Sequence, residues 1–340
     1  MIIRAKAPLR IGMAGGGTDV SPYSDIYGGA ILNATVSMYA YATIEPLYNG
    51  KIIFDAVDIN CYAEFDSATE LPIHSELSLF CGIYNRIVQL YGLPPLSFRL
   101  TTFVDAPKGS GMGTSSTITV AMLGAFVEWL SLPLGEYDIA HLAYQIERID
   151  LNMAGGKQDQ YAATFGGFNF MEFYDNDKVI VNPLRIKARY VHELEFNLLL
   201  YYTGTSRLSA TIIEKQADNF SHKAEKPLEA AHKLKEQAVM MKEALLRGKL
   251  DAIGEILDFG WYHKKQMAAG ISNPEIDTIY ETAKRAGATG GKISGAGGGG
   301  FMMFYVPGTA RYRVIQALQA FKGELHPFTF THIGLMSWKI

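Results

Sequence analysis

The sequence predicts an α+β protein of two domains, because strand patterns dominate its first half and helical patterns dominate the start of its second half. The chain has 340 residues, a length that favours about two domains. Apolar runs typical of strands gather before residue 185, whereas apolar residues at helical spacing follow it. We therefore expect one domain over residues 1–185 and another over residues 186–340.

The first domain is expected to combine strands with three helices. Apolar, β-branched and aromatic runs predict strands, namely residues 2–13, 39–46, 51–54 and 97–104, and a hairpin over 166–173 and 178–181. Apolar residues that recur every three or four positions predict helices over residues 76–91, 115–130 and 136–149.

The second domain is expected to open on a strand and continue with long helices. The helical patterns cover residues 207–220, 226–247, 249–268, 274–286 and 310–321. The strand patterns cover residues 196–202, 301–306 and 327–332. A glycine-rich segment at residues 290–300 separates the helices from the strand that follows it.

The composition argues against several classes of protein. The net charge is −3, so no broad basic surface is expected for nucleic acid or for an anionic membrane. Cys61 and Cys81 are the two cysteines of the chain, and their spacing fits neither a disulfide framework nor a zinc site. No signal peptide or membrane-spanning run is recognisable. We expect a cytoplasmic protein with a small-molecule partner, without nucleic acid or membrane, and a homodimer stays open.

A glycine-rich loop lies between a predicted strand and a predicted helix. Gly109, Gly111 and Gly113 remove side chains where a ligand would approach the backbone, and the helix that follows offers free N–H groups at its start. Such a loop is typical of a phosphate site. The hydroxyls at residues 114–117 are also ordinary helix caps, and that alternative stays open. The order of the glycines matches neither the Walker A nor the dinucleotide-binding pattern.

Two carboxylates follow this helix in the sequence. Phosphoryl transfer needs a group that holds a metal ion and a group that takes the proton of the acceptor. Glu147, on a predicted helix, and Asp159, after a Gly-Gly turn, are candidates for these two tasks. The alternatives are a solvated helix face for Glu147 and a helix N-cap for Asp159.

Three motifs resemble those of the galactokinase, homoserine kinase, mevalonate kinase and phosphomevalonate kinase (GHMP) superfamily. They read Ala-Pro-Leu-Arg-Ile-Gly-Met-Ala-Gly-Gly-Gly-Thr-Asp at residues 7–19, Pro-Lys-Gly-Ser-Gly-Met-Gly-Thr-Ser-Ser at 107–116, and Lys-Ile-Ser-Gly-Ala-Gly-Gly-Gly-Gly-Phe at 292–301. They occur in the order that the family has. The resemblance implies a GHMP kinase fold, with an N-terminal α/β domain that contains a left-handed crossover and a ferredoxin-like C-terminal domain.

The resemblance also implies roles for individual residues. ATP would be bound by the second motif, that is, by Pro107, Gly109, Ser110, Gly111, Met112, Gly113, Thr114, Ser115 and Ser116. The family commonly has Leu in place of Met112 and Ser in place of Thr114. Mg²⁺ would be held by Ser115 and Glu147, Asp159 would be the catalytic base, and Arg10 would stabilise the transferring group. The sugar would be bound by Gly16, Gly17, Thr18, Asp19 and Gly156. The third motif would pack against the phosphate site.

The first motif is similar to that of a narrower group, which contains D-glycero-D-manno-heptose 7-phosphate kinases and the kinase portion of fucokinases. Gly17 stands where the fucokinase portion usually has a tryptophan, and Leu-Asn-Ala-Thr at residues 32–35 fits the heptose branch. The resemblance implies transfer of the ATP γ-phosphoryl group to the anomeric O1 of heptose 7-phosphate.

Other functions remain open at this point. The acceptor could be fucose, arabinose, galactose or another sugar, and the protein could instead be a non-catalytic sensor of ATP and sugar or a nucleotide-binding interaction protein. A phosphorylated acceptor would need cations, for which the sequence offers Lys6, Lys108, Lys157, Arg207 and Lys292.

Overall fold

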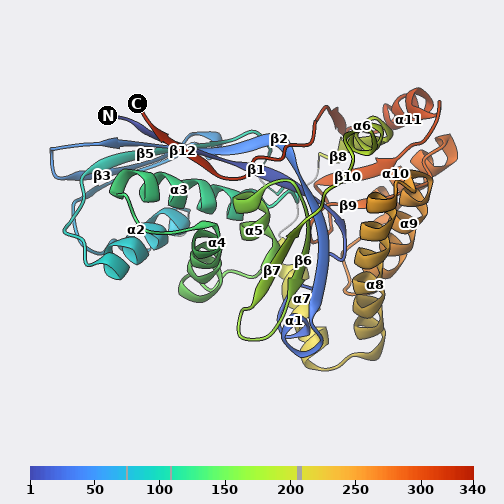
Figure 1. Cartoon of the computed structure of the whole chain (residues 1–340), viewed down its shortest axis with the longest axis horizontal. Coiled ribbons are helices and arrows are strands. Elements are labelled where there is room, and N and C mark those ends of the chain that lie inside the picture. Colours follow the sequence, from blue (N-terminus) through green and yellow to red (C-terminus); the bar gives the residue numbers. More distant parts are fainter. Residues whose placement is uncertain (74–75, 108, 205–208) are drawn as a thin grey trace.

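The computed structural model describes residues 1–73, 76–107, 109–204 and 209–340, and its strands form two sheets (Figure 1). The first sheet has the strand order β12-β1-β2-β5-β3-β4, with β6 and β7 branching from β2. Its strands are β1 (Ile3–Ala14), β2 (Gly29–Pro46), β3 (Lys51–Ala56), β4 (Cys61–Asp66), β5 (Phe98–Val104), β6 (Phe168–Phe173), β7 (Val179–Pro183) and β12 (Met336–Lys339). The pair β3/β5 is parallel and is joined through a helix.

The long strand β2 divides the first sheet into two branches. Its first residues pair with β6 and its last residues pair with β5, while β1 runs antiparallel beside it. The short strand β12 pairs with β1, so the end of the chain returns to the first sheet. Strand β1 leads into the first glycine motif, which contacts the second half of the chain, since the N–H groups of Gly12 and Gly15 donate to the side chains of Ser294 and Gln237.

Helices cover one face of the first sheet (Figure 1). They are α2 (Ser78–Tyr91), α3 (Thr114–Leu130), α4 (Glu136–Gln145) and α5 (Gln158–Phe165), and the short helix α1 (Tyr23–Tyr27) precedes β2. Every residue of α3 from Ser116 to Phe126 is buried. A helix that is apolar on all sides belongs inside a protein, and α3 packs against β1 and β2 as well as α2, α4 and α5. The position of its N-terminus is therefore firmly determined.

The second sheet has the strand order β11-β8-β10-β9, with antiparallel neighbours. Its strands are β8 (Leu198–Tyr202), β9 (Gly290–Ile293), β10 (Phe301–Tyr305) and β11 (Glu324–His326). Helices separate β8 from β9 and β10 from β11, whereas β9 and β10 are joined by the glycine loop without a helix. This β-α-β-β-α-β succession is the ferredoxin-like arrangement that the family resemblance implied.

The helices of the second half are α6 (Ala188–Asn197), α7 (Ser209–Ser221), α8 (Glu225–Arg247), α9 (Ile253–Lys264), α10 (Pro274–Ala286) and α11 (Arg311–Leu318). The boundary that we predicted near residue 185 falls between β7 and α6 and stays a prediction. Across the part of the chain that the structure describes, no helix has the length and apolarity needed to cross a membrane.

Several elements differ from the sequence prediction. The helix predicted over residues 249–268 is shorter, since a 3₁₀ turn (Leu250–Ala252) precedes α9. Residues 327–332 form one isolated bridge to β2 rather than a strand. The helix predicted over residues 136–149 ends as α4 at Gln145 and widens into a π-helical turn (Ile146–Asp150). Turns of this kind are frequent at functional sites, and this one carries Glu147.

Candidate active site

A cavity of about 310 Å³ lies where the three glycine-rich motifs meet. Its walls combine β1 and the loops of the first domain with α7, α9 and the glycine loop of the second domain. The predicted residues that line it are Arg10, Gly16, Gly17, Asp19, Gly109, Gly111, Gly113, Thr114, Ser115, Ser116, Gly156, Asp159 and Lys292. The size and the mixed polar lining suit a small-molecule ligand.

The glycine loop at residues 109–113, which is the predicted phosphate loop, has a backbone that only glycine adopts easily. Gly111 and Gly113 both have φ of +76°, in the left-handed region. A Cβ on Gly113 would lie 3.0 Å from Cγ of Asp159, and a Cβ on Gly111 would overlap the carbonyl oxygen of Ser294. Helix α3 begins at Thr114, immediately after the loop, and no side chain caps its start. The first N–H groups of α3 are therefore available to an anion at the cavity wall.

The third motif packs directly on the phosphate loop, as we expected. The backbone N–H of Phe301 donates to the carbonyl oxygen of Ser110 over 2.9 Å. A Cβ on Gly295 would lie 2.7 Å from the carbonyl oxygen of Gly111, and a Cβ on Gly300 would lie 2.5 Å from that of Ser110. Two loops almost 200 residues apart in the sequence can approach this closely because a glycine without a side chain lies at each of the closest contacts.

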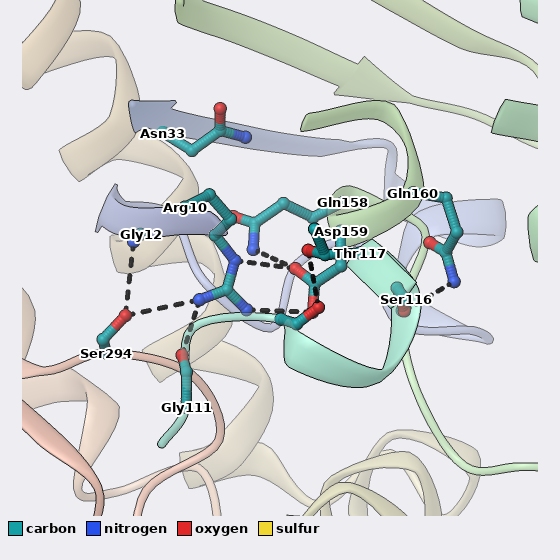
Figure 2. A network of polar contacts seen from close by, with 12 residues as sticks. Arg10, Gly12, Asn33, Gly111, Ser116, Thr117, Gln158, Asp159, Gln160 and Ser294 are labelled. Carbon is teal, nitrogen blue, oxygen red and sulfur yellow. Dashed lines mark hydrogen bonds and ion pairs between the residues drawn. The ribbon is translucent and has the colours of Figure 1, made fainter. Parts of the chain in front are cut away.

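Arg10 and Asp159, which both line the cavity, form a bidentate ion pair (Figure 2). Nε and Nη2 of Arg10 donate to the two carboxylate oxygens over 2.7 and 2.9 Å. Nη1 of Arg10 donates to the carbonyl oxygen of Gly111 over 2.6 Å and to Oγ of Ser294 over 3.3 Å. One guanidinium thus connects the first motif, the phosphate loop, the third motif and the catalytic candidate Asp159.

The carboxyl groups of Asp159 and Asp19 have opposite pKa shifts. Burial raises the pKa of Asp159, but the charge of Arg10 and hydrogen bonds from Arg10 and Gln158 outweigh it, so this pKa lies below its ordinary value. Burial raises the pKa of Asp19 above its ordinary value, against a backbone hydrogen bond from Gln158. That N–H donates to Asp19 over 3.0 Å. A Cβ on Gly156 would overlap the Asp19 carboxylate, so glycine is required there.

Glu147 is fully buried, which excludes the solvated helix face that the sequence left open. Oγ of Ser116 and Oγ1 of Thr119 donate to its carboxylate over 2.7 and 3.0 Å, and the Gln160 side-chain amide also donates to it. Oγ of Ser115 lies 3.5 Å from Oε1 of Glu147, the longest of these contacts. Nη2 of Arg148 lies 3.3 Å from the other carboxylate oxygen.

Five of the predicted site residues do not line the cavity, namely the buried Glu147 described above and four binding residues that have other contacts. Ser110 and Met112 are fully buried, and their carbonyl oxygens accept hydrogen bonds from Phe301 and Arg10. The hydroxyl of Thr18 donates to the carbonyl oxygens of Gly15 and Ala30, so it stabilises the turn rather than facing a ligand. Pro107, the fourth, accepts a backbone hydrogen bond from Ser110. Asp159 lies in the first turn of α5, which rules out the N-cap alternative.

Of the candidate cations, Lys292 reaches the cavity, and its Nζ donates to the carbonyl oxygen of Gly12 over 2.6 Å. Lys157 is buried between Asp25 and Asp177, at 3.3 and 2.9 Å, and does not line the cavity. Lys6 lies over the ring of Tyr39. Lys108 and Arg207 lie outside the described residues.

Sequence reasoning missed five polar residues of the cavity wall, namely Arg148, Gln158, Ser209, Gln216 and Lys264. Lys264 is the last residue of α9, where a basic side chain is ordinarily a solvated helix end. Its burial depends on contacts with the first motif, more than 240 residues away, and no local pattern announces them.

Comparison with known proteins gives consistent matches. Residues 78–167 match the model for the N-terminal domain of GHMP kinases, and residues 241–323 match the model for their C-terminal domain. The chain is 50% identical to a D-glycero-alpha-D-manno-heptose 7-phosphate kinase of Campylobacter jejuni, over 99% of both chains.

Two further proteins show the range of similarity. A crystal structure described as a D-glycero-D-manno-heptose 1-phosphate kinase from Bacteroides thetaiotaomicron is 49% identical, with a TM-score of 0.85 and 99% of both chains covered. An L-fucokinase/L-fucose-1-P guanylyltransferase of Bacteroides fragilis is 26% identical, over 88% of this chain and 34% of that protein.

Proposed function

Because the chain belongs to the GHMP kinases, a family of ATP-dependent phosphotransferases, we propose that it transfers the γ-phosphoryl group of ATP to the anomeric O1 of D-glycero-D-manno-heptose 7-phosphate. The relatives of high identity are sugar phosphate kinases, and they support a sugar kinase here as the broader statement. The identity of 50% to a heptose 7-phosphate kinase against 26% to a fucokinase favours the heptose as the acceptor.

The observation that carries the proposal is the Arg10–Asp159 pair beside an anion-binding loop. The three glycines and the N-terminus of α3 suit the phosphates of ATP, whose charge the helix end stabilises. Arg10 lies between this loop and Asp159, so the same guanidinium can stabilise negative charge on the transferring group. A second aspartate, Asp19, lies on the opposite side of Gln158 and suits the hydroxyls of a sugar.

Asp159 acts on the acceptor hydroxyl in this proposal. Its lowered pKa keeps it ionised at neutral pH, so it accepts a hydrogen bond from the C1 hydroxyl and orients the oxygen toward the phosphorus. A carboxylate of low basicity takes the proton late. This suffices because phosphoryl transfer passes through a loose transition state with little bonding to the nucleophile. An anomeric hydroxyl is also more acidic than an ordinary alcohol, which eases the transfer.

The residue types around Glu147 fit the Mg²⁺ that such kinases use. Ser115 and Glu147 supply neighbouring hydroxyl and carboxylate oxygens, the hard ligands that Mg²⁺ prefers together with phosphate oxygens. When bound, the ion would neutralise charge on the nucleotide phosphates. The hydrogen bonds from Ser116 and Thr119 hold the Glu147 carboxylate in place for this task.

A second acceptor is heptose 1-phosphate, which is the substrate class in the description of the Bacteroides thetaiotaomicron structure. That reaction would use the same nucleotide site and the same Asp159 but a hydroxyl at the other end of the sugar. Both reactions give a 1,7-bisphosphate, so the acceptor that supports ADP release separates the two proposals.

The test is ADP release by the purified protein with Mg-ATP and a panel of acceptors. The panel contains heptose 7-phosphate, heptose 1-phosphate, mannose, fucose, galactose and a control without acceptor. We expect release with heptose 7-phosphate and a product that ³¹P NMR identifies as the 1,7-bisphosphate. Release with heptose 1-phosphate alone would favour the second acceptor, and release with a free sugar alone would contradict both. ATP binding without release would identify a sensor.

A further inference from the structure

Lys264 is a buried cation that forms no ion pair with a carboxylate of the described residues, although the charge of Asp19 acts on it from a greater distance. It is 4% exposed and lines the cavity from the end of α9. Its Nζ donates to the carbonyl oxygen of Gly16 over 3.0 Å and lies 3.5 Å from Oε1 of Gln216. An ammonium group has three N–H donors, and neither of these acceptors carries a charge. A buried ammonium that is not neutralised costs free energy until an anion reaches it.

Gln216 supplies a second, independent sign of a missing ligand. It is 1% exposed and lines the same cavity from α7. Because Lys264 can only donate, Oε1 of Gln216 faces it, and Nε2 is left without any hydrogen-bond partner among the described residues. Buried polar atoms almost always have a partner. An orphan N–H₂ group beside an uncompensated ammonium is a pair of donors suited to one anion.

Gly17 leaves space in front of these donors. A Cβ on Gly17, which has φ of +99°, would lie 2.9 Å from Nζ of Lys264 and 3.0 Å from Oε1 of Gln216. The absence of a side chain at this position keeps Lys264 and Gln216 open to the cavity. We call Gly17, Gln216 and Lys264 the lysine corner.

The lysine corner lies on the acceptor side of the cavity. The contacts of Lys264 are with Gly16 and Gln216, and its charge acts on Asp19, the residue suited to sugar hydroxyls. The phosphate loop is contacted by other groups, because Gly113 faces Asp159 and Gly111 faces Ser294 and Arg10. An anion in the lysine corner is therefore a different group from the phosphates on the glycine loop.

We propose that Lys264 and Gln216 bind the phosphate group that the sugar acceptor already carries before the reaction. This inference rests on the proposed function, since it names the part of the site that distinguishes a sugar phosphate from a free sugar. A phosphate brings two negative charges and several acceptor oxygens, which neutralise Lys264 and satisfy the Gln216 amide together. A free sugar would leave the ammonium uncompensated, so the lysine corner selects for phosphorylated acceptors.

The experiment compares Lys264→Met with Lys265→Met, a matched control. Lys265 is the next residue, is exposed, and lies outside the cavity. Steady-state kinetics are measured with Mg-ATP and either heptose 7-phosphate or the same heptose without phosphate. We expect Lys264→Met to raise KM for heptose 7-phosphate by about 10- to 100-fold, as expected for the loss of a charge-assisted hydrogen bond. KM for ATP and the kinetics with unphosphorylated heptose should stay unchanged, as should every parameter of Lys265→Met.

Gln216→Glu gives a second test, which does not depend on whether the Lys264→Met variant folds well. It retains the size of the side chain and places a negative charge where the phosphate would bind, so it should raise the same KM at least as much. Equal effects of the substitutions on the kinetics with both heptoses would overturn the inference. An increase confined to KM for ATP would assign the lysine corner to the nucleotide. A wild-type protein that uses both heptoses equally well would overturn it as well. If no heptose is phosphorylated at all, the proposed function fails instead.

Discussion

The two ends of the cavity hold their charges in different ways. At the end where we propose that the nucleotide binds, Arg10 is neutralised by Asp159, and the proposed anion site consists of backbone N–H groups that carry only partial charges. At the end where we propose that the acceptor binds, Lys264 is buried, and in the described structure its Nζ donates to a carbonyl and an amide oxygen instead of a carboxylate. One end therefore contains a closed ion pair before a ligand binds, whereas Lys264 at the other end has no carboxylate at ion-pair distance and feels only the more distant charge of Asp19.

This difference implies that one end of the cavity positions the reacting groups and the other end selects the acceptor. A compensated ion pair holds its side chains in place and positions the reacting groups in advance, which is how sites for phosphoryl transfer lower the barrier. An uncompensated cation contributes little to positioning but binds strongly to a ligand that supplies the missing charge. We expect substitutions at the first end to reduce turnover and substitutions at the second end to weaken binding of the acceptor.

The largest effect is expected from Asp159→Asn. It removes the negative charge from the end of the cavity that holds the Arg10–Asp159 pair, which we call the compensated end. The amide cannot take the proton of the acceptor, and it interrupts the bidentate contact with Arg10. We expect kcat to fall by about 100-fold or more while the Kd for ATP stays nearly unchanged. Single-turnover kinetics and calorimetric titration with ATP measure the two quantities.

The control for that variant is Asp66→Asn, because Asp66 forms an exposed ion pair with Lys51 far from the cavity. It should leave both quantities unchanged. Near-normal turnover of Asp159→Asn would contradict the role of Asp159 and remove the distinction between the two ends.

A smaller effect is expected from Gly111→Ala, which tests whether the compensated end depends on contact between two glycine loops. Gly111 and Gly50 have similar φ angles, +76° and +69°, but a Cβ on Gly50 would meet nothing within 4 Å. Both substitutions cost about 1–2 kcal/mol for the left-handed backbone. Gly111→Ala should cost about 1–3 kcal/mol more, because the Cβ would overlap Ser294. Denaturant unfolding measures the difference, and equal losses would argue that the loops can separate freely.

The compensated end could be predicted from the sequence to a large extent. The phosphate loop is one continuous segment, and its strand, glycines and helix follow one another in a recognisable order. The strand β1 and the helices α2 and α3 lie close to their predicted bounds, since each has its own apolar periodicity. The GHMP fold and its ferredoxin-like second sheet are confirmed, although the family resemblance predicted them and periodicity alone did not.

The rest depends on contacts between distant segments. Strand β9 begins with two glycines and is a strand because it pairs with β10, and β12 is a strand because it pairs with β1. Glu147 has the sequence context of a solvated helix face, and its burial arises from donors on α3 and α5. Lys264 and Gln216 belong to two helices whose sequences give no sign of a ligand.

The pH dependence of acceptor binding should further distinguish the two ends of the cavity. Burial lowers the pKa of Lys264 to about 8 against the opposing charge of Asp19, and burial together with Lys264 and Arg10 lowers that of Lys292 to about 7. As the pH rises through 8, Lys264 loses its proton and its attraction for phosphate. KM for heptose 7-phosphate should therefore rise about 10-fold from pH 7 to pH 9. KM for ATP should not follow, and the Lys264→Met variant should lose most of this dependence.

The smallest effect is expected on the stability of the ligand-free protein. The pKa of Lys264 lies lower in the folded state than in the unfolded state, so below pH 8 the buried ammonium destabilises the fold. This destabilisation disappears as the pH approaches the pKa of a lysine in the unfolded chain, near 10. Lys264→Met should therefore raise Tm at pH 7 by roughly 2 °C, with little gain at pH 10, while Lys265→Met leaves Tm unchanged. Scanning calorimetry at both pH values provides the comparison. A lower Tm for Lys264→Met at pH 7 would mean that the ammonium is already compensated without a ligand, and the two ends of the cavity would then be alike.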